Sequence, residues 1–430
     1  MEVHGPYIAI KDFIRRDRTS NQQPPSISPD YQVTLTTTST PEFLHHLLEL
    51  TRRWGPEGLL SVAVYVPGTD YLLASNIIAA LRRCSPAIRR QVDWHLVYDR
   101  AHPPKGLNLS ASHFENAEKD DNDKEEEEEE GLSTYDESYF QYHHFQRCSC
   151  DSSKALFAKC LASNAALRPS YKRRHSLTYP INVLRNVART AATATRYLLA
   201  SDIELYTSAD LAAAFSAFIA ALEAKEEEED KALQQSKPRR RRVFMLPIFE
   251  VNATIEAPET KRALMAAFER GQAQFFHASI CDECQRFPGR GDWITSINTS
   301  VNSSYFTSNQ SGIRRPDPLQ IFGVTKRTAA LGLRHWEPIY IGTHAEPLYD
   351  ERLSWEGKLD KMSQMYELCL LDYDIVILDN GFIVHAPGIK QLDPEDSQRR
   401  APFLALNRPL YEEALWSLRL LYGVYDSPCD

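Results

Sequence analysis

Short apolar stretches alternate with amphipathic stretches in the N-terminal part of the chain, after a polar, proline-bearing segment. Strands are predicted at the β-branched run that begins with Val33 and Leu35, at 60–66 and at 92–98. The stretch 60–66 is nearly all apolar, which is typical of a strand covered on both faces. Between these strands, apolar side chains recur at helical spacing, at 43–51 and 72–81. This order predicts an α/β fold with a mixed, mostly parallel central sheet flanked by helices.

The same patterns recur further along the chain, interrupted by charged or polar segments. A helix is expected at 183–196, and further strands at 197–206, 243–249, 339–341 and 373–378. Segments with few apolar residues predict loop or disordered insertions at 111–145, 223–242 and 294–320. We therefore expect a polar lead-in over 1–30, ordered structure from Tyr31, and a single domain over 31–430 that carries the insertions.

Charge is concentrated in the insertions. Residues 115–130 hold eleven acidic side chains against two lysines, which alone accounts for the net charge of −9. The rest of the chain is balanced, so the global charge does not favour a nucleic-acid-binding surface. The basic run 237–242 directly follows acidic residues, and we interpret the two as a self-compensating surface loop rather than a nuclear localisation signal. No stretch approaches the roughly 18 consecutive apolar residues of a membrane helix.

The chain has eight cysteines, too few for a small disulfide scaffold. Cys281 and Cys284 have the spacing of half a zinc site, but the other close pair, Cys148 and Cys150, lacks standard finger spacing. We therefore favour a disulfide or packed thiols over zinc for Cys281 and Cys284. Five Asn-x-Ser/Thr triplets favour a secretory route only weakly.

The strand expected at 197–206 contains two acidic residues near its end, Asp202 and Glu204. Side chains two positions apart on a strand point to the same side, so we expect the two carboxylates to converge. Converging carboxylates at the C-terminal edge of a sheet suit a hard divalent cation that holds a diphosphate. On its own such a pair is more often two exposed acids at a strand end, so the surrounding motifs decide between these interpretations.

Several motifs surround this pair. They are Tyr179-Pro180, Asn182, Leu184-Arg185-Asn186, Ala188-Arg189, Leu246-Pro247-Ile248-Phe249-Glu250, Cys281-x-x-Cys284, Trp336-Glu337-Pro338-Ile339-Tyr340, Tyr349-Asp350-Glu351-Arg352 and Gly381-Phe382-Ile383-Val384-His385. With them, residues 31–390 resemble glycosyltransferase family 49, which includes β-1,4-glucuronyltransferase 1 and the glucuronyltransferase half of the LARGE enzymes. The resemblance is collinear and is broken only by the charged insertions.

The resemblance implies a GT-A-type nucleotide-sugar-binding fold, a UDP-sugar donor, expected to be UDP-glucuronate, and Mn²⁺. Asp202 and Glu204 match the two acidic positions of the family's metal site, and His385 matches the histidine that completes it. Two carboxylates and a neutral imidazole can together ligate Mn²⁺. The family has aspartate where this chain has Glu204, which is one methylene longer. A shifted ligand geometry is therefore expected, and weakened activity stays open.

Polar residues of the helix expected before the metal-site strand are candidates for donor contacts. Arg185, Asn186 and Asn182 lie there, and with Asp202 we expect them to bind the nucleotide sugar. A planar guanidinium suits a phosphate or carboxylate group. The alternative is an ordinary polar face of an amphipathic helix.

Direct displacement with inversion at the anomeric carbon needs a base for the proton of the acceptor hydroxyl. The segment 355–361 lies where enzymes of this fold often carry that carboxylate. Asp360 is the first candidate, and Glu356 and Glu367 are the next. For each of them, a place on a helix surface is the alternative.

The resemblance thus predicts an inverting, metal-dependent glycosyltransferase that transfers glucuronic acid from UDP-glucuronate to a xylose-terminated glycan on a glycoprotein, of the O-mannosyl type on dystroglycan. Two alternatives stay open: a catalytically weakened relative that binds a glycan or nucleotide, and a transferase that uses another UDP-sugar. The family implies a type II membrane protein of the Golgi. The start of the chain shows neither a signal peptide nor an anchor, so we expect a truncated chain or an atypical topology.

Overall fold

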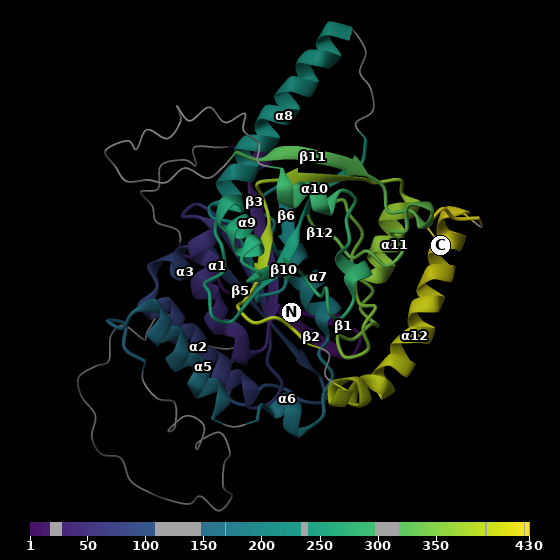
Figure 1. The fold of residues 1–430 in the computed structure, drawn as a ribbon. Helices are drawn as coiled ribbons and strands as arrows, with labels where there is room; N and C mark the ends of the chain where they lie inside the picture. Colours follow the sequence, from purple (N-terminus) through teal and green to yellow (C-terminus); the bar gives the residue numbers. More distant parts are fainter. Residues whose placement is uncertain are drawn as a thin grey trace, which may run out of the picture.

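The computed structural model describes residues 1–17, 28–107, 148–167, 169–233, 240–296, 318–391, 394–424 and 426–429. These residues form a ten-stranded mixed sheet and a four-stranded sheet, with helices packed around them (Figure 1). The prediction of an α/β fold with a mixed sheet flanked by helices is confirmed. The predicted insertion at 111–145, and all but the ends of the one at 294–320, lie outside the described residues.

The large sheet has the strand order β1-β2-β5-β4-β3-β6-β12-β8-β13-β11. Its strands are β1 (Glu2–His4), β2 (Tyr7–Ile14), β3 (Val33–Ser39), β4 (Leu59–Tyr65), β5 (Val92–Asp99), β6 (Tyr197–Ala200), β8 (Arg242–Leu246), β11 (Gln320–Thr325), β12 (Ile339–Thr343) and β13 (Asp374–Asp379). The neighbours β5, β4, β3 and β6 run parallel, whereas β12 runs antiparallel to β6. The C-terminal ends of β3 and β6 and the N-terminal end of β12 therefore meet at one edge.

The small sheet continues from this edge. Its order is β10-β9-β14-β7, with β10 (Ala273–Phe275), β9 (Ile248–Val251), β14 (Ile383–His385) and β7 (Leu205–Thr207). The strands β14 and β7 are antiparallel, and His385 lies opposite Leu205. This register brings the end of β14 next to the segment that connects β6 to β7.

The helices are α1 (Leu47–Trp54), α2 (Asp70–Cys84), α3 (Pro86–Gln91), α5 (Lys154–Ala166), α6 (Tyr171–Arg174), α7 (Ile181–Ala191), α8 (Leu211–Leu233), α9 (Lys261–Glu269), α10 (Arg290–Thr295), α11 (Met362–Leu370) and α12 (Pro394–Tyr422). Helix α7 packs on β3 and β4. Helix α12 runs along one side of the molecule beside α11, and α8 extends beyond the sheets (Figure 1). None of the helices in the described part of the chain is long and apolar enough to cross a bilayer.

The prediction that ordered structure begins at Tyr31 is wrong. Residues before it form β1 and β2, and β2 pairs with β5 so that Tyr7 lies opposite Asp99. A strand gains its backbone hydrogen bonds from its neighbour, and here that neighbour is about 90 residues away in the sequence. The local composition of residues 1–30 therefore carried no signal of the pairing.

Three predicted elements have different bounds in the structure. The expected strand at 197–206 is two strands of different sheets, β6 and β7, with a turn between them that places Asp202 and Glu204 outside regular strand. The expected strand at 243–249 is likewise divided into β8 and β9, because Pro247 between them has no N–H to donate. The helix expected at 183–196 ends at Ala191.

The prediction of a loop at 223–242 is wrong for its first part. Helix α8 continues through the acidic run to Leu233, and residues 234–239 lie outside the described part of the chain. Alanine, glutamate and lysine are strong helix formers, so a charged composition at 223–233 does not argue against a helix.

All eight cysteines form disulfides: Cys84–Cys150, Cys148–Cys160, Cys281–Cys284 and Cys369–Cys429. For Cys281 and Cys284, the structure thus confirms the disulfide that we favoured over zinc. The pair Cys369–Cys429 ties helix α11 to the segment after α12.

Candidate active site

The two acidic residues of the metal motif lie in the turn between β6 and β7, where β6 ends. The N–H of Leu205 donates to the carbonyl of Asp202 at 3.0 Å and closes this turn. The site is therefore built at the C-terminal edge of the parallel strands, the edge at which ligands of open α/β sheets bind.

Helix α7 supplies the cationic centre of the site. Its apolar side chains, among them Val183, Leu184 and Val187, pack against the large sheet, while its polar residues 182, 185, 186 and 189 recur at helical spacing on another face. That face is covered by the segment 346–360, so even the polar side chains of α7 are buried. A buried polar face needs partners, and the hydrogen bonds below provide them.

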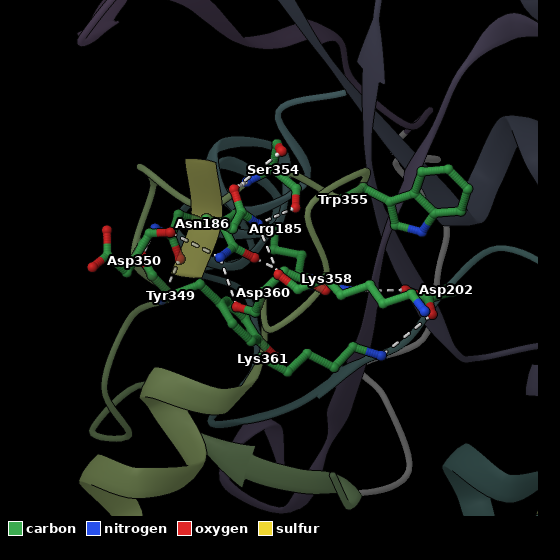
Figure 2. A network of polar contacts seen from close by, with 12 residues as sticks. Arg185, Asn186, Asp202, Tyr349, Asp350, Ser354, Trp355, Lys358, Asp360 and Lys361 are labelled. Atoms are coloured by element: carbon green, nitrogen blue, oxygen red, sulfur yellow. Dashed lines mark hydrogen bonds and ion pairs between the residues drawn. The ribbon is translucent and has the colours of Figure 1, made fainter. Parts of the chain in front are cut away.

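Arg185 joins two carboxylates from distant parts of the chain (Figure 2). Its guanidinium donates to Oδ1 of Asp202 at 3.1 Å, to Oδ2 of Asp360, and to the side-chain oxygen of Asn182 at 3.0 Å. The ring of Tyr349 lies 5.2 Å from its guanidinium carbon. One arginine therefore orients two acids that are more than 150 positions apart in the sequence.

A second cation reaches the same carboxylate. Nζ of Lys361 lies 3.4 Å from Oδ2 of Asp202 (Figure 2). Burial alone would raise the pKa of Asp202, but the charges of Lys361 and Arg185 outweigh it and hold this pKa well below its usual value. Asp202 is therefore ionised near neutral pH.

The loop that carries Asp360 and Lys361 is held from both sides. On the α7 side, the amide of Asn182 donates to the carbonyls of Asp350 and Asp360 at 2.8 and 2.7 Å. On the other side, Nδ2 of Asn407 in α12 donates to the carbonyls of Ser354 and Lys358 at 2.8 and 2.7 Å.

These contacts hold an unusual backbone. Lys358 and Leu359 both have positive φ, 54° and 60°, which costs energy in non-glycine residues. Contacts from α7 and α12 thus hold the loop in the conformation that presents Asp360 and Lys361.

Asn186 binds the segment 346–360 that covers helix α7. Its side chain accepts from the N–H of Tyr349 at 3.0 Å and donates to the Tyr349 carbonyl at 2.9 Å. It also donates to Oε1 of Glu351 at 3.0 Å. Of the residues predicted to contact the donor, Asn182, Arg185 and Asp202 are joined by hydrogen bonds. Asn186 binds the neighbouring residues Tyr349 and Glu351. Contact of these residues with the donor stays a prediction.

Glu204 and His385 lie next to each other through their backbones. The N–H of Ala386 donates to the carbonyl of Glu204 at 2.8 Å. Nδ1 of His385 donates to the carbonyl of Ala386 at 2.7 Å, because a carbonyl can only accept, and Nε2 therefore carries the lone pair of the ring. Burial lowers the pKa of His385 to about 4, so the ring is neutral near pH 7.

Two observations bear on the predicted Mn²⁺ site. Nε2 of His385 is buried and has no hydrogen-bond partner among the described residues. A neutral imidazole whose other nitrogen donates to a carbonyl is the usual arrangement of a metal-ligating histidine. The described residues include no group of three carboxylate, imidazole or thiol side chains gathered around one point, however. The donor chemistry fits a divalent cation, and the ligand set Asp202, Glu204 and His385 stays a prediction.

The carboxylates predicted as catalytic base have partners of different kinds. Asp360 is bound by Arg185 within the network around Asp202. Glu356 pairs with Nζ of Lys172 at 2.8 Å and accepts from the N–H of Tyr179 at 2.9 Å. Glu367 accepts from the hydroxyl of Tyr422 in α12 at 2.6 Å. The structure thus joins only Asp360 directly to the residues around Asp202.

A further carboxylate near this network was not predicted from the sequence. Glu337 lies two residues before β12, is partly buried, and interacts electrostatically with Lys361, Asp360 and Arg185. The sequence signal was its position in the motif Trp336-Glu337-Pro338, which was used there only for the resemblance.

Comparisons with known proteins agree with this architecture. Residues 32–423 match a family model described as glycosyl-transferase for dystroglycan. The chain is 28% identical to beta-1,4-glucuronyltransferase 1 of Danio rerio over 425 residues, which cover 99% of this chain and 82% of that protein. Identity to the protein of the same name from Homo sapiens is 25% over 392 residues, 91% of this chain and 76% of that protein.

A more distant relative matches a smaller part. Identity to xylosyl- and glucuronyltransferase LARGE2s of Gallus gallus is 24% over 246 residues, which cover 57% of this chain and 28% of that protein. The family model spans the residues of the Arg185 network together with Glu204, Glu337 and His385. The resemblance read from the motifs is thereby confirmed: the chain belongs to glycosyltransferase family 49, the glycosyl-transferase for dystroglycan family, and is a glycosyltransferase.

Proposed function

We propose that the protein transfers glucuronic acid from UDP-glucuronate, with inversion, to a xylose-terminated glycan on a glycoprotein. The observation that carries the proposal is the similarity to beta-1,4-glucuronyltransferase 1 along 99% of the chain, which includes every residue of the candidate site. The name of that relative supplies the donor sugar and the β-1,4 linkage.

The charges at the edge of the large sheet support this chemistry. Departure of UDP places negative charge on the diphosphate, and preorganised cations stabilise such charge without reorganisation. Arg185 and Lys361 are held close to Asp202 by ion pairs and hydrogen bonds, so their positions are set before the donor binds. Asp202 stays ionised between them and offers oxygen ligands or acceptors for donor hydroxyls.

A divalent cation held by Asp202, Glu204 and His385 would supply Lewis-acid stabilisation of the diphosphate. The unpartnered, buried Nε2 of His385 supports its part in this set. Glu204 is about one-third exposed, and its Oε1 lies 4.0 Å from Nε2 of His46, so its side chain can turn toward a ligand without breaking a hydrogen bond.

The disulfides support a luminal compartment. Four pairs that include every cysteine are typical of proteins that fold in the secretory route, because the cytosol keeps thiols reduced. We therefore propose residence in the lumen of the Golgi, as for enzymes that build glycans on glycoproteins. Localisation of the tagged full-length protein by microscopy tests this part.

The test of the activity is UDP release in the presence of a donor panel and a β-xylosyl acceptor, with and without Mn²⁺. UDP-glucuronate should support turnover at least tenfold faster than the other UDP-sugars. Asp202→Ala should lose turnover while its circular dichroism spectrum and melting temperature stay close to those of the wild type. Turnover with another UDP-sugar would reassign the donor. Binding of UDP without turnover on any xylosyl acceptor would instead identify a non-catalytic relative.

A further inference from the structure

The inverting reaction needs a carboxylate that is free to accept a proton, and most carboxylates near Asp202 are already engaged. Asp202 pairs with Arg185 and Lys361, and Asp360 pairs with Arg185. Lys361 and Arg185 hold the pKa of Asp202 low, so Asp202 makes a weak base, and the Asp360 carboxylate is occupied by its ion pair with Arg185. The base is therefore better sought among acids that face the network without being bound by it.

Glu337 has this position. Strand β12 runs antiparallel to β6, with Ile341 opposite Leu199, so the segment that leads into β12 lies at the edge where β6 ends. The Glu337 side chain interacts electrostatically with Lys361, and Lys361 also contacts Asp202. Within the described residues, no side-chain hydrogen bond to its carboxylate is present, and the residue is partly exposed. The carboxylate is thus near the predicted donor site and available to a ligand.

The backbone of Glu337 is fixed by the loop that the Cys281–Cys284 disulfide closes. Its N–H donates to the carbonyl of Cys284 at 2.8 Å, and its carbonyl accepts from the side chain of Gln285 at 3.1 Å. The neighbouring Trp336 is fully buried. A catalytic group must be held close to its productive position, and these contacts hold the chain on both sides of the Glu337 side chain.

We propose that Glu337 is the catalytic base of this enzyme. This inference rests on the proposed function. In the reaction, the acceptor hydroxyl oxygen forms a bond to the anomeric carbon of the sugar. The bond between that carbon and the diphosphate oxygen breaks, and its electron pair leaves with UDP. The proton of the hydroxyl passes to the Glu337 carboxylate, so charge and atoms balance.

The electrostatic surroundings agree with this role. Burial raises the pKa of Glu337 to about 7, with Asp360 adding to the rise and Lys361, Arg185 and Arg327 opposing it. A base whose pKa lies near the working pH combines a large ionised fraction with useful proton affinity. Of the other carboxylates near Asp202, Asp360 is held by Arg185 and Glu204 belongs to the predicted metal set, so neither is placed in this way.

The test compares Glu337→Gln with wild type and with Glu283→Gln, an exposed glutamate of the same disulfide loop, as the matched control. We expect kcat to fall about a hundredfold to ten-thousandfold in Glu337→Gln, with UDP affinity within about threefold of wild type. Glu283→Gln should stay within about twofold. The wild-type rate should fall below pH 7, where the base becomes protonated, and Glu337→Gln should lose this dependence.

A second measurement separates a base from a structural residue. An acceptor with fluorine next to the reacting hydroxyl has a more acidic hydroxyl and depends less on a base. The rate ratio of this acceptor to the parent acceptor should be at least about tenfold higher in Glu337→Gln than in wild type. If the wild type is active and Glu337→Gln shows the same rate ratio as the wild type, or keeps full activity, then Glu337 is not the base. That result leaves the proposed function standing. A wild type that binds UDP but transfers to no acceptor overturns the proposed function and this inference with it.

Discussion

A single methyl group at Gly357 should detach the loop that carries Asp360 and Lys361. A Cβ built at Gly357 would lie 2.2, 2.3 and 2.6 Å from Cγ, Nδ2 and Oδ1 of Asn407. Asn407 is only 2% exposed and its amide is hydrogen-bonded to the loop, so its side chain cannot turn away without breaking those bonds. Gly357→Ala must therefore displace Asn407 from its partners in the loop.

The size of the effect follows from those partners. Asn407 makes four hydrogen bonds to the loop: it donates to the carbonyls of Ser354 and Lys358, and accepts from the N–H and hydroxyl of Ser354. At a net value of about 0.75 kcal/mol each, within the usual range for a hydrogen bond, the loss of all four should cost about 3 kcal/mol of local stability. Asn407→Ala should cost a similar amount. The double variant should cost no more than Asn407→Ala alone, because the three atoms that collide with the new methyl group are then absent.

Amide hydrogen exchange is the suitable assay, since it reports local opening of the loop. The N–H groups of Lys358 and Met362 are hydrogen-bonded within this segment, to the carbonyls of Trp355 and Leu359. Their exchange should accelerate roughly a hundredfold in either single variant, which corresponds to about 3 kcal/mol. Additive costs in the double variant, or unchanged exchange in Gly357→Ala, would show that Asn407 does not hold the loop.

Three further predictions concern the metal, a disulfide and a buried imidazole. His385→Ala should weaken binding of Mn²⁺ itself by at least about tenfold, measured by electron paramagnetic resonance of the free ion; unchanged affinity would remove His385 from the ligand set. Replacing Cys369 and Cys429, which are 60 positions apart, by serine should lower the free energy of unfolding in urea by up to about 4 kcal/mol, and a loss below about 1 kcal/mol would contradict this. Burial lowers the pKa of His95 to about 4, below the value of about 6.5 in an unfolded chain. The neutral His95 ring therefore stabilises the fold above pH 6.5, and this contribution is lost as the pH falls toward 4. Between pH 7 and 4.5, wild type should lose about 2–3 kcal/mol more than His95→Gln, and equal losses would refute the assignment.

Elements with strong local signals were predictable. The β-branched run beginning at Val33 and the apolar strand β4 appeared where their patterns indicated, and the amphipathic helix α7 was found with an earlier end than expected. Residues at a strand end, such as Asp202, could be predicted as site candidates, because ligands of open α/β sheets bind at the carboxyl ends of the strands. The family could be predicted because several separate motifs occur in a fixed order. The order of motifs is visible in the sequence without any knowledge of which residues contact one another.

Contacts between distant segments were not predictable. Nothing near Arg185 in the sequence indicates that it binds Asp360, because that contact requires α7 and the loop before α11 to pack together. The same holds for Asn407, whose partners lie about 50 positions earlier, and for Glu337, which approaches Lys361 through the antiparallel pairing of β12 with β6.

For this protein, the sequence alone determined the class of fold, most of the helices and strands around the site, and membership of the family. These depend on side-chain periodicity and on short motifs, both of which are local properties. The tertiary structure decided which charges face one another, which acids are already paired, and which carboxylates have no hydrogen-bond partner among the described residues. Electrostatic energies depend on distance and burial, and both are set only when segments far apart in the chain pack together.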